Sequence, residues 1–323
     1  MRASSRVLAL SLFAIASAAT LDAQAKVMSG YVAGAGGVRI FYELVGNGPD
    51  TVAFLHGTPS TMYSLARDFA GLGDRFTLLF FDQRGGGRSQ LVLSADSLTW
   101  QDHVRDVEAL REQLHISRLR LFGVSWGSLL AARYAAQYPQ RVKRVVLFPM
   151  RARSSPDVPA EPGQLAPPMD NTVRRRADSL VVAWPTSADP RAVCEEYWRL
   201  QRPGFFADTV RAQAMLGSFC EEPPEVLRHT WQVSAARLRS LGTYDLRPEL
   251  RQIHVPVLVV KGTHTTMYHA WTEEWALALP NSRVLWIENT GLLPWIEKPN
   301  QVFPALRAFY AGSWPAGAKR VGN

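Results

Sequence analysis

The sequence predicts an α/β fold in which a mostly parallel sheet is flanked by helices and interrupted by an inserted helical segment. Three observations lead to this prediction. Short apolar runs, such as residues 51–55, alternate with segments of helical periodicity, such as 100–114. A Gly-x-Ser-x-Gly pentapeptide at 123–127 lies between a strand-like run and a helix-forming run. Residues 149–246 contain no strand-like run. Apolar strands that alternate with helices are typical of a parallel sheet covered on both faces.

Residues 1–25 have the layout of a secretory signal peptide. Arg2 and Arg6 precede an apolar run over 7–19, and an A-x-A cleavage site follows at 23–25. The apolar run is too short to favour a membrane-spanning helix, and no later run is long enough to cross a bilayer. We therefore expect an exported protein, periplasmic or secreted, with no stable membrane span.

The segment from residue 26 to 148 is expected to supply most of the sheet. Strand-like runs occur at residues 27–33, 38–44, 51–55, 76–81, 119–122 and 142–148. The turn Gly34–Gly37 joins the first two runs as a hairpin. Helices are expected from residue 60, over 100–114, where apolar residues recur at helical spacing, and over 128–136. His103 is expected to be exposed on the second of these helices.

Composition changes at Pro149, where a stretch rich in proline, arginine and alanine begins. Strands resume at 255–260 and 283–287, with helices at 271–279 and 301–310 and a frayed tail after residue 313. We therefore divide the mature chain into a core, residues 26–148 and 247–313, and a helical cap, residues 149–246.

Charge and cysteine usage narrow the classes of partner. The formal net charge is +8, but the basic residues are scattered. The one tight run, Arg174-Arg175-Arg176, has no nucleic-acid motif beside it, so we interpret it as a solvated helix face and expect no nucleic-acid partner.

Two alternatives stay open for Cys194 and Cys220, a disulfide or two buried thiols. Histidines and cysteines are dispersed, so we infer no metal site and no cofactor.

The pentapeptide Gly123-Val124-Ser125-Trp126-Gly127 fits the nucleophile-elbow pattern. Its sharp turn puts the central serine in a strained backbone conformation and requires small residues two positions before and after it. The turn also exposes the serine hydroxyl beside the positive end of a helix, where negative charge is stabilised. Ser125 is therefore the candidate nucleophile.

Three motifs in this order carry a resemblance to a known family: His56-Gly57-Thr58-Pro59, the loop Asp82-Gln83-Arg84-Gly85-Gly86-Gly87-Arg88-Ser89, and the elbow. Over nearly all of the mature chain the sequence resembles the α/β-hydrolases, and within them the proline iminopeptidase-like group of serine peptidases. The resemblance implies hydrolysis of amide or ester bonds in a small-molecule or short-peptide ligand held under the cap.

The resemblance also implies roles for individual residues. The backbone N–H groups of Trp126 and Thr58 would form the oxyanion hole, and His56 and Asp82 would hold their loops. In aminopeptidases of this group, acidic cap residues bind the free amine of the substrate. Glu195 and Glu196 are similar in type to such a site, with a solvated helix face as the alternative.

The catalytic partners of the serine are substituted. A serine hydroxyl needs a base, usually oriented by a carboxylate, and in this fold the acid and then the histidine follow the serine in the chain. The acid is expected in a G-x-x-D segment, which here reads Gly262-Thr263-His264-Thr265. The histidine is expected in a G-H-x-P-W segment, which here reads Gly291-Leu292-Leu293-Pro294-Trp295. Neither Thr265 nor Leu292 can accept a proton near pH 7.

These substitutions leave two hypotheses. In the first, which we favour, the protein is a catalytically impaired member in which Ser125 is a hydrogen-bonding serine of a ligand pocket. In the second, it is an active hydrolase in which His264 or His269, on the loop where the acid is expected, serves as the base. No histidine comes after His269 in the chain.

Overall fold

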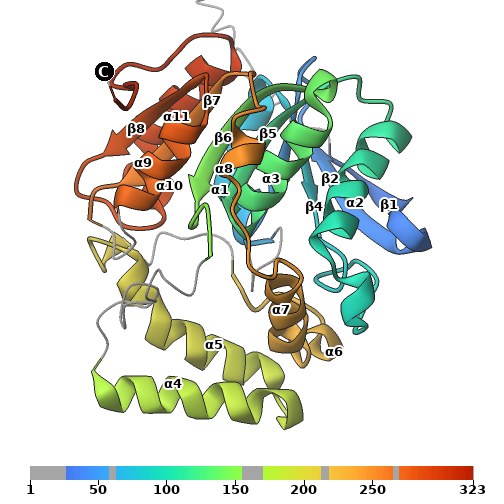
Figure 1. Ribbon diagram of the computed structural model, residues 1–323. Coiled ribbons are helices and arrows are strands. Elements are labelled where there is room, and N and C mark those ends of the chain that lie inside the picture. The colour runs from blue at the N-terminus through green and yellow to red at the C-terminus, as the bar shows by residue number, and fades with distance from the viewer. Residues whose placement is uncertain (1–26, 58–62, 155–169, 212–217, 265–268, 323) are drawn as a thin grey trace, which may run out of the picture.

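The computed structural model describes residues 27–57, 63–154, 170–211, 218–264 and 269–322. In this part of the chain, eight strands form one sheet in the order β1-β2-β4-β3-β5-β6-β7-β8 (Figure 1). The strands are β1 (Val27–Ala33), β2 (Arg39–Val45), β3 (Thr51–Leu55), β4 (Thr77–Phe81), β5 (Leu119–Ser125), β6 (Val142–Pro149), β7 (Val257–Gly262) and β8 (Ser282–Ile287). The hairpin β1–β2 and the β2–β4 pair are antiparallel, and all pairs from β4 to β8 are parallel. The predicted α/β fold with a mostly parallel sheet is confirmed.

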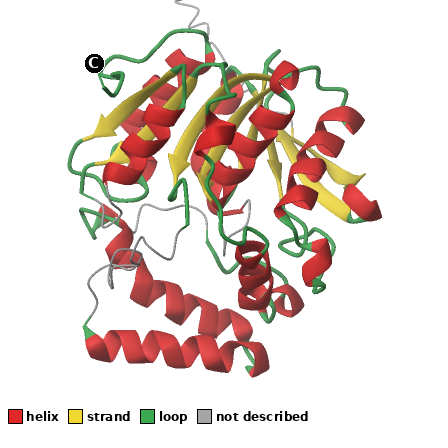
Figure 2. Cartoon of the chain, in the orientation of Figure 1, coloured by secondary structure: helices red, strands yellow, loops and turns green. Residues whose placement is uncertain are grey.

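Helices cover both faces of this sheet (Figure 2). The α-helices of the described residues are α1 (Tyr63–Phe69), α2 (Trp100–Gln113), α3 (Trp126–Gln137), α4 (Asn171–Ala183), α5 (Pro190–Gln201), α6 (Pro224–Leu227), α7 (Thr230–Arg239), α8 (Arg247–Leu250), α9 (His269–Ala278), α10 (Pro294–Glu297) and α11 (Pro299–Tyr310). Helices α2, α3, α8 and α9 pack on one face, and α1, α10 and α11 on the other. Ala53 and Leu55 of β3 face the first group, whereas Val52 and Phe54 face the second. This two-sided burial explains why the strand is apolar throughout.

Helices α4 to α7 lie between β6 and β7 in the chain, and they occupy the side of the sheet toward which the arrowhead of β6 points (Figure 1). A disulfide joins Cys194 of α5 to Cys220, which answers the question that the sequence left open. The disulfide is packed among Trp184, Trp198 and Leu227. Arg174-Arg175-Arg176 is exposed on α4.

Two local expectations were wrong. The tail beyond residue 313 is packed, because Val284 of β8 and Lys319 exchange backbone hydrogen bonds of 2.8 and 2.9 Å and Trp314 packs on Phe309. His103 is 1% exposed, because its face of α2 packs edge-on against the Trp126 ring of α3. Residues 1–25 lie outside the described part of the chain. None of the described helices has the length and apolarity that crossing a bilayer requires.

Candidate active site

Ser125 stands where β5 turns into α3. Its backbone angles, φ 51° and ψ −121°, are strained for a residue that carries a side chain. Trp126 is the first residue of α3, so its N–H belongs to the amide groups that the helix itself leaves unbonded. The local geometry therefore places the Ser125 hydroxyl beside the positive end of a helix.

Close packing explains the two glycines of the elbow. A methyl group on Gly127 would lie 1.9 Å from the carbonyl oxygen of Leu55, and one on Gly123 would lie 2.7 Å from the carbonyl oxygen of Gly127. Larger residues at either position would collide with backbone atoms, which cannot move as a flexible side chain can. Glycine at these positions lets α3 approach the end of β3 while β5 turns sharply.

His56 and Gln83 form a hydrogen-bonded frame beside the elbow. The Gln83 backbone N–H donates to Nε2 of His56 at 3.2 Å, so Nδ1 carries the ring proton and donates to the Gly57 carbonyl oxygen at 2.8 Å. The Gln83 side chain accepts from the indole N–H of Trp126 at 2.8 Å. Burial and then the charge of Arg237 lower the pKa of His56 to about 3. His56 is therefore a neutral positioning residue with both ring nitrogens occupied.

The loop after β4 is closed by Asp82, which is fully buried. Its carboxylate accepts from the Arg88 backbone N–H at 2.9 Å, and its carbonyl oxygen accepts from the Ser89 hydroxyl at 2.5 Å. Gly87 has φ 56°, and a methyl group there would lie 2.1 Å from the Asp82 carboxyl carbon. The Asp82 carboxylate thus holds the shape of this loop, and Gly87 allows the chain to turn closely around it.

The loops after β7 and β8 lie against each other. The His264 backbone N–H donates to the Thr290 carbonyl oxygen at 2.9 Å. Gly262 lies so close to the loop after β8 that a methyl group on it would be 2.1 Å from the carbonyl oxygen of Gly291. Since β5, β7 and β8 run parallel, these loops leave the same edge of the sheet as Ser125. The fold therefore brings the loops of the acid and histidine positions to the edge that carries the serine.

Leu292, at the histidine position, lies half-buried in this edge. Its backbone N–H donates to the carbonyl oxygen of Phe205 at 2.7 Å, and its side chain packs on the apolar cluster of the α1 and α11 face. Trp295 anchors the same loop edge-on against Phe148, with ring centroids 5.0 Å apart. The loop is ordered and presents an apolar side chain where a catalytic base is expected.

The two alternative bases lie differently. Nε2 of His269 is 3.1 Å from the Thr263 carbonyl oxygen, and its ring packs on Trp286 of β8, with centroids 4.8 Å apart. The His269 ring therefore lies against β8. In the sheet, β6 and β7 separate β8 from β5, the strand that ends at Ser125, and the distance from β5 to β8 is about 14 Å. His264 is exposed at the end of the described acid loop.

Thr58 and Thr265, assigned to the oxyanion hole and the acid position, lie outside the described residues. Within the part of the chain that the structure describes, the Ser125 hydroxyl has no hydrogen-bond partner.

A profile of the family described as alpha/beta hydrolase fold matches residues 50–299. The chain belongs to this family.

Sequence relatives of this α/β-hydrolase carry one recurrent name. Proline iminopeptidase of Neisseria meningitidis serogroup A is 44% identical over 112 residues, which cover 34% of this chain and 36% of that protein. Probable proline iminopeptidase of Leptolyngbya boryana is 25% identical over 282 residues, which cover 78% of this chain and 84% of that protein. The chain is therefore proline iminopeptidase-like, although the match to the Neisseria protein spans about a third of that protein's length.

Solved structures resemble most of this α/β-hydrolase. A thermophilic esterase from Thermogutta terrifontis superposes with a TM-score of 0.66 at 21% identity, covering 88% of this chain and 98% of that one. An esterase from Exiguobacterium antarcticum superposes with a TM-score of 0.68 at 17% identity, covering 88% and 100%. At such identities the likeness establishes the fold.

The paired glutamates of α5 in this α/β-hydrolase do different things. Glu195 lines a cavity of about 390 Å³ together with Trp198 and Arg199. Glu196 instead forms a two-pronged ion pair with Arg176 of α4, with both N–O distances 2.8 Å. Of the two glutamates, Glu195 lines this cavity, whereas the Glu196 carboxylate is held by Arg176.

Sequence reasoning missed Glu297, which organises the histidine-position loop. Its carboxylate accepts three backbone hydrogen bonds, from Gly291 at 2.6 Å, from Ala207 at 2.8 Å and from Asp208 at 2.9 Å. It thereby ties the loop after β8 to the segment after α5. The one available signal was a lone carboxylate within the otherwise apolar run 292–297.

Proposed function

We propose that this protein is an exported, proline iminopeptidase-like α/β-hydrolase whose hydrolysis of amide and ester bonds is impaired, and which binds a small-molecule or short-peptide ligand near Ser125, under the cap. The observation that carries the proposal is Leu292, at the histidine position of an ordered loop. With Thr265 at the acid position, Ser125 lacks both a proton acceptor and the group that would orient one. The elbow and the Trp126 N–H would still bind a carbonyl group.

The second candidate function is an active serine hydrolase with a noncanonical base. The observation that favours it is the exposure of His264, on a loop at the same edge of the sheet as Ser125. His269 would first have to leave the Thr263 carbonyl oxygen and the Trp286 ring.

Export is supported by the charged and apolar layout of residues 1–25 and by the Cys194–Cys220 disulfide, since disulfides persist in oxidising compartments. Expression with the native N-terminus would then yield a mature protein that begins near Lys26. The intact mass of the purified protein measures this directly, and a full-length mass in the cytosolic fraction would contradict export.

The activity proposal is tested by putting the missing groups back. Thr265→Asp with Leu292→His should raise ester and proline-arylamide hydrolysis by about 10²–10⁴-fold, the usual contribution of a positioned general base. Thr265→Asn with Leu292→Gln is the matched control of similar shape that cannot accept a proton. Adding Ser125→Ala to the first variant should abolish the gain.

Two outcomes would count against impairment. The first is rapid labelling of the unaltered protein at Ser125 by a fluorophosphonate, mapped by mass spectrometry, which would point to an activated serine and to His264. The second is a folded Thr265→Asp, Leu292→His variant with no gain in turnover, which would mean that the loss of activity does not lie at these two positions.

A further inference from the structure

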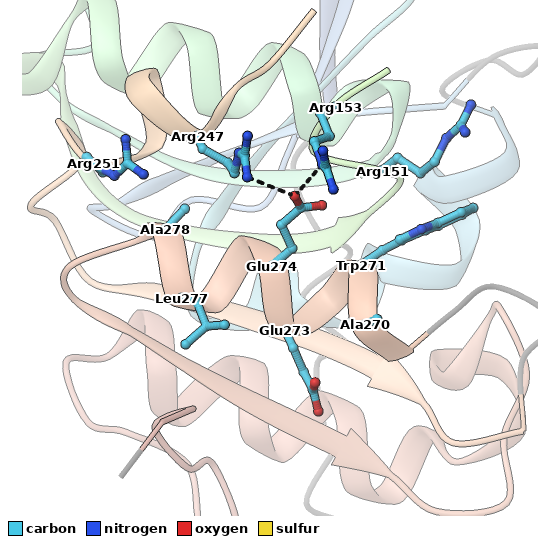
Figure 3. A pocket seen from close by; sticks show the side chains of 10 residues that line it. All are labelled: Arg151, Arg153, Arg247, Arg251, Ala270, Trp271, Glu273, Glu274, Leu277 and Ala278. Carbon is cyan, nitrogen blue, oxygen red and sulfur yellow. Dashed lines mark hydrogen bonds and ion pairs between the residues drawn. The ribbon is translucent and has the colours of Figure 1, made fainter. Parts of the chain in front are cut away.

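A cavity of about 500 Å³ lies between the segment that follows β6, helix α8 and helix α9 (Figure 3). Four arginines line it: Arg151 and Arg153 after β6, and Arg247 and Arg251 around α8. Helix α9 faces them with an apolar wall made by Ala270, Trp271, Leu277 and Ala278. Such a volume suits a small organic ligand. No residue of this cavity belongs to the elbow or to the two substituted triad positions, so a ligand bound here would be distinct from the ligand proposed for Ser125.

Two of the four arginines are compensated by carboxylates. Nε of Arg153 lies 2.8 Å from the Glu274 carboxylate, and Arg247 lies 3.8 Å from the same oxygen. Arg247 also forms a two-pronged pair with Asp245, at 2.9 and 2.6 Å. Figure 3 shows Glu274 reaching up between Arg153 and Arg247. This carboxylate thus occupies the centre of the arginine row.

The two outer arginines are not compensated in this way. Within the described residues, neither Arg151 nor Arg251 has a carboxylate at ion-pair distance. The Arg151 guanidinium lies 5.3 Å from the centroid of the Trp271 ring, and its Nε is buried without a hydrogen-bond partner. Glu273 lines the cavity, but its side chain points away from the arginines (Figure 3). The arginine side of the cavity therefore carries excess positive charge and an unused donor.

We propose that this cavity binds a small organic anion through a carboxylate or phosphate group. Guanidinium groups donate paired hydrogen bonds to such oxyanions, and a buried donor without a partner is costly until an acceptor arrives. The apolar wall of α9 would cover the carbon part of the ligand, with Trp271 beside the Arg151 guanidinium. Since Glu274 already occupies the central arginines, it competes with the incoming anion.

Isothermal titration calorimetry at low ionic strength tests this proposal. The probes are succinate and inorganic phosphate, and neutral succinamide is the control ligand. Saturable binding of at least one anion is expected, and the tighter of the two identifies the preferred group. The double variant Arg151→Gln, Arg251→Gln should weaken that binding by roughly tenfold or more. Glu274→Gln should tighten it by a few-fold, because the competing charge is removed.

Arg175→Gln is the matched control, since it removes one exposed positive charge from α4, away from the cavity. The Arg175→Gln variant should bind the anion with the same affinity as the unaltered protein. The proposal is overturned if neither anion binds saturably, or if the arginine double variant binds as tightly as Arg175→Gln. These readouts measure binding and not turnover, so they are independent of the activity of Ser125.

Discussion

Gly127 packs against the end of β3 with no room for a side chain. A methyl group there would lie 1.9 Å from the Leu55 carbonyl oxygen, whereas a methyl group on Gly71 would have no atom within 4 Å. This contrast separates a steric requirement of the elbow from the general cost of replacing a glycine. The absence of a Cβ atom at Gly127 thus sets how closely α3 approaches the sheet.

We therefore expect Gly127→Ala to unfold the protein or to lower its stability by about 3 kcal/mol or more, because backbone atoms on both sides would have to move. Gly71→Ala should change stability by about 0.5 kcal/mol or less. Urea unfolding followed by circular dichroism measures both. Equal stability of the two variants would show that the elbow relaxes more freely than its packing implies.

His103 is the second residue-scale case, because both its ring nitrogens are buried without a partner in the described part of the chain. Burial, together with the charges of Arg237 and Arg84, holds its pKa well below the ordinary value of about 6.5. The folded protein keeps this ring neutral, whereas the unfolded chain takes up a proton below that value. The contribution to stability is therefore complete above about pH 6.5 and is lost as the pH falls below it.

For His103→Leu we expect little loss of stability at pH 7.5, since no hydrogen bond is broken. Between pH 7.5 and 5.5 the unaltered protein should lose about 1.4 kcal/mol more than this variant, one pKa unit of linkage for one histidine. Urea titrations at both pH values measure the difference. His254→Gln, at an exposed histidine, is the control, and equal pH dependence in His103→Leu and the unaltered protein would contradict the argument.

At the scale of elements, most boundaries are set by local pattern. The predicted runs 27–33 and 51–55 coincide with β1 and β3 because turn residues and apolar runs delimit short strands. The four-residue helices α8 and α10 were missed because one turn carries no periodicity. The expectation of a frayed tail failed because its backbone partner, Val284, lies on a distant strand.

The disulfide staples α5 to the segment before α6, across a sequence separation of 26 residues. Closing a loop of this length should stabilise the folded protein by about 3.5 kcal/mol in the chain-entropy view. Cys194→Ser with Cys220→Ser should therefore lower the melting temperature, and a reducing agent should lower it only in the unaltered protein. Calorimetry with and without the reductant measures this, and an unchanged melting temperature in the double variant would count against the staple.

At the scale of the whole molecule, buried charges join the helical insertion to the core. The Glu222 carboxylate accepts the Gly87 backbone N–H at 2.8 Å, and Arg237 donates to the Arg84 carbonyl oxygen at 2.6 Å. Both side chains are buried, so each leaves water only because it meets a partner on the loop after β4. These contacts orient the insertion above the edge that carries Ser125. No periodicity in the sequence signals them, because each joins segments far apart in the chain.

The sequence by itself determined the mostly parallel α/β architecture, the elbow with its two glycines, and the absence of a histidine beyond residue 269. These features depend on residue type and on spacing along a few turns or strands. Only the tertiary structure decided that His103 is buried, that Cys194 meets Cys220, that His269 packs on Trp286, and that arginines from two segments line one cavity. Those outcomes depend on which faces of distant elements meet, and that is set by packing of the whole chain rather than by local pattern.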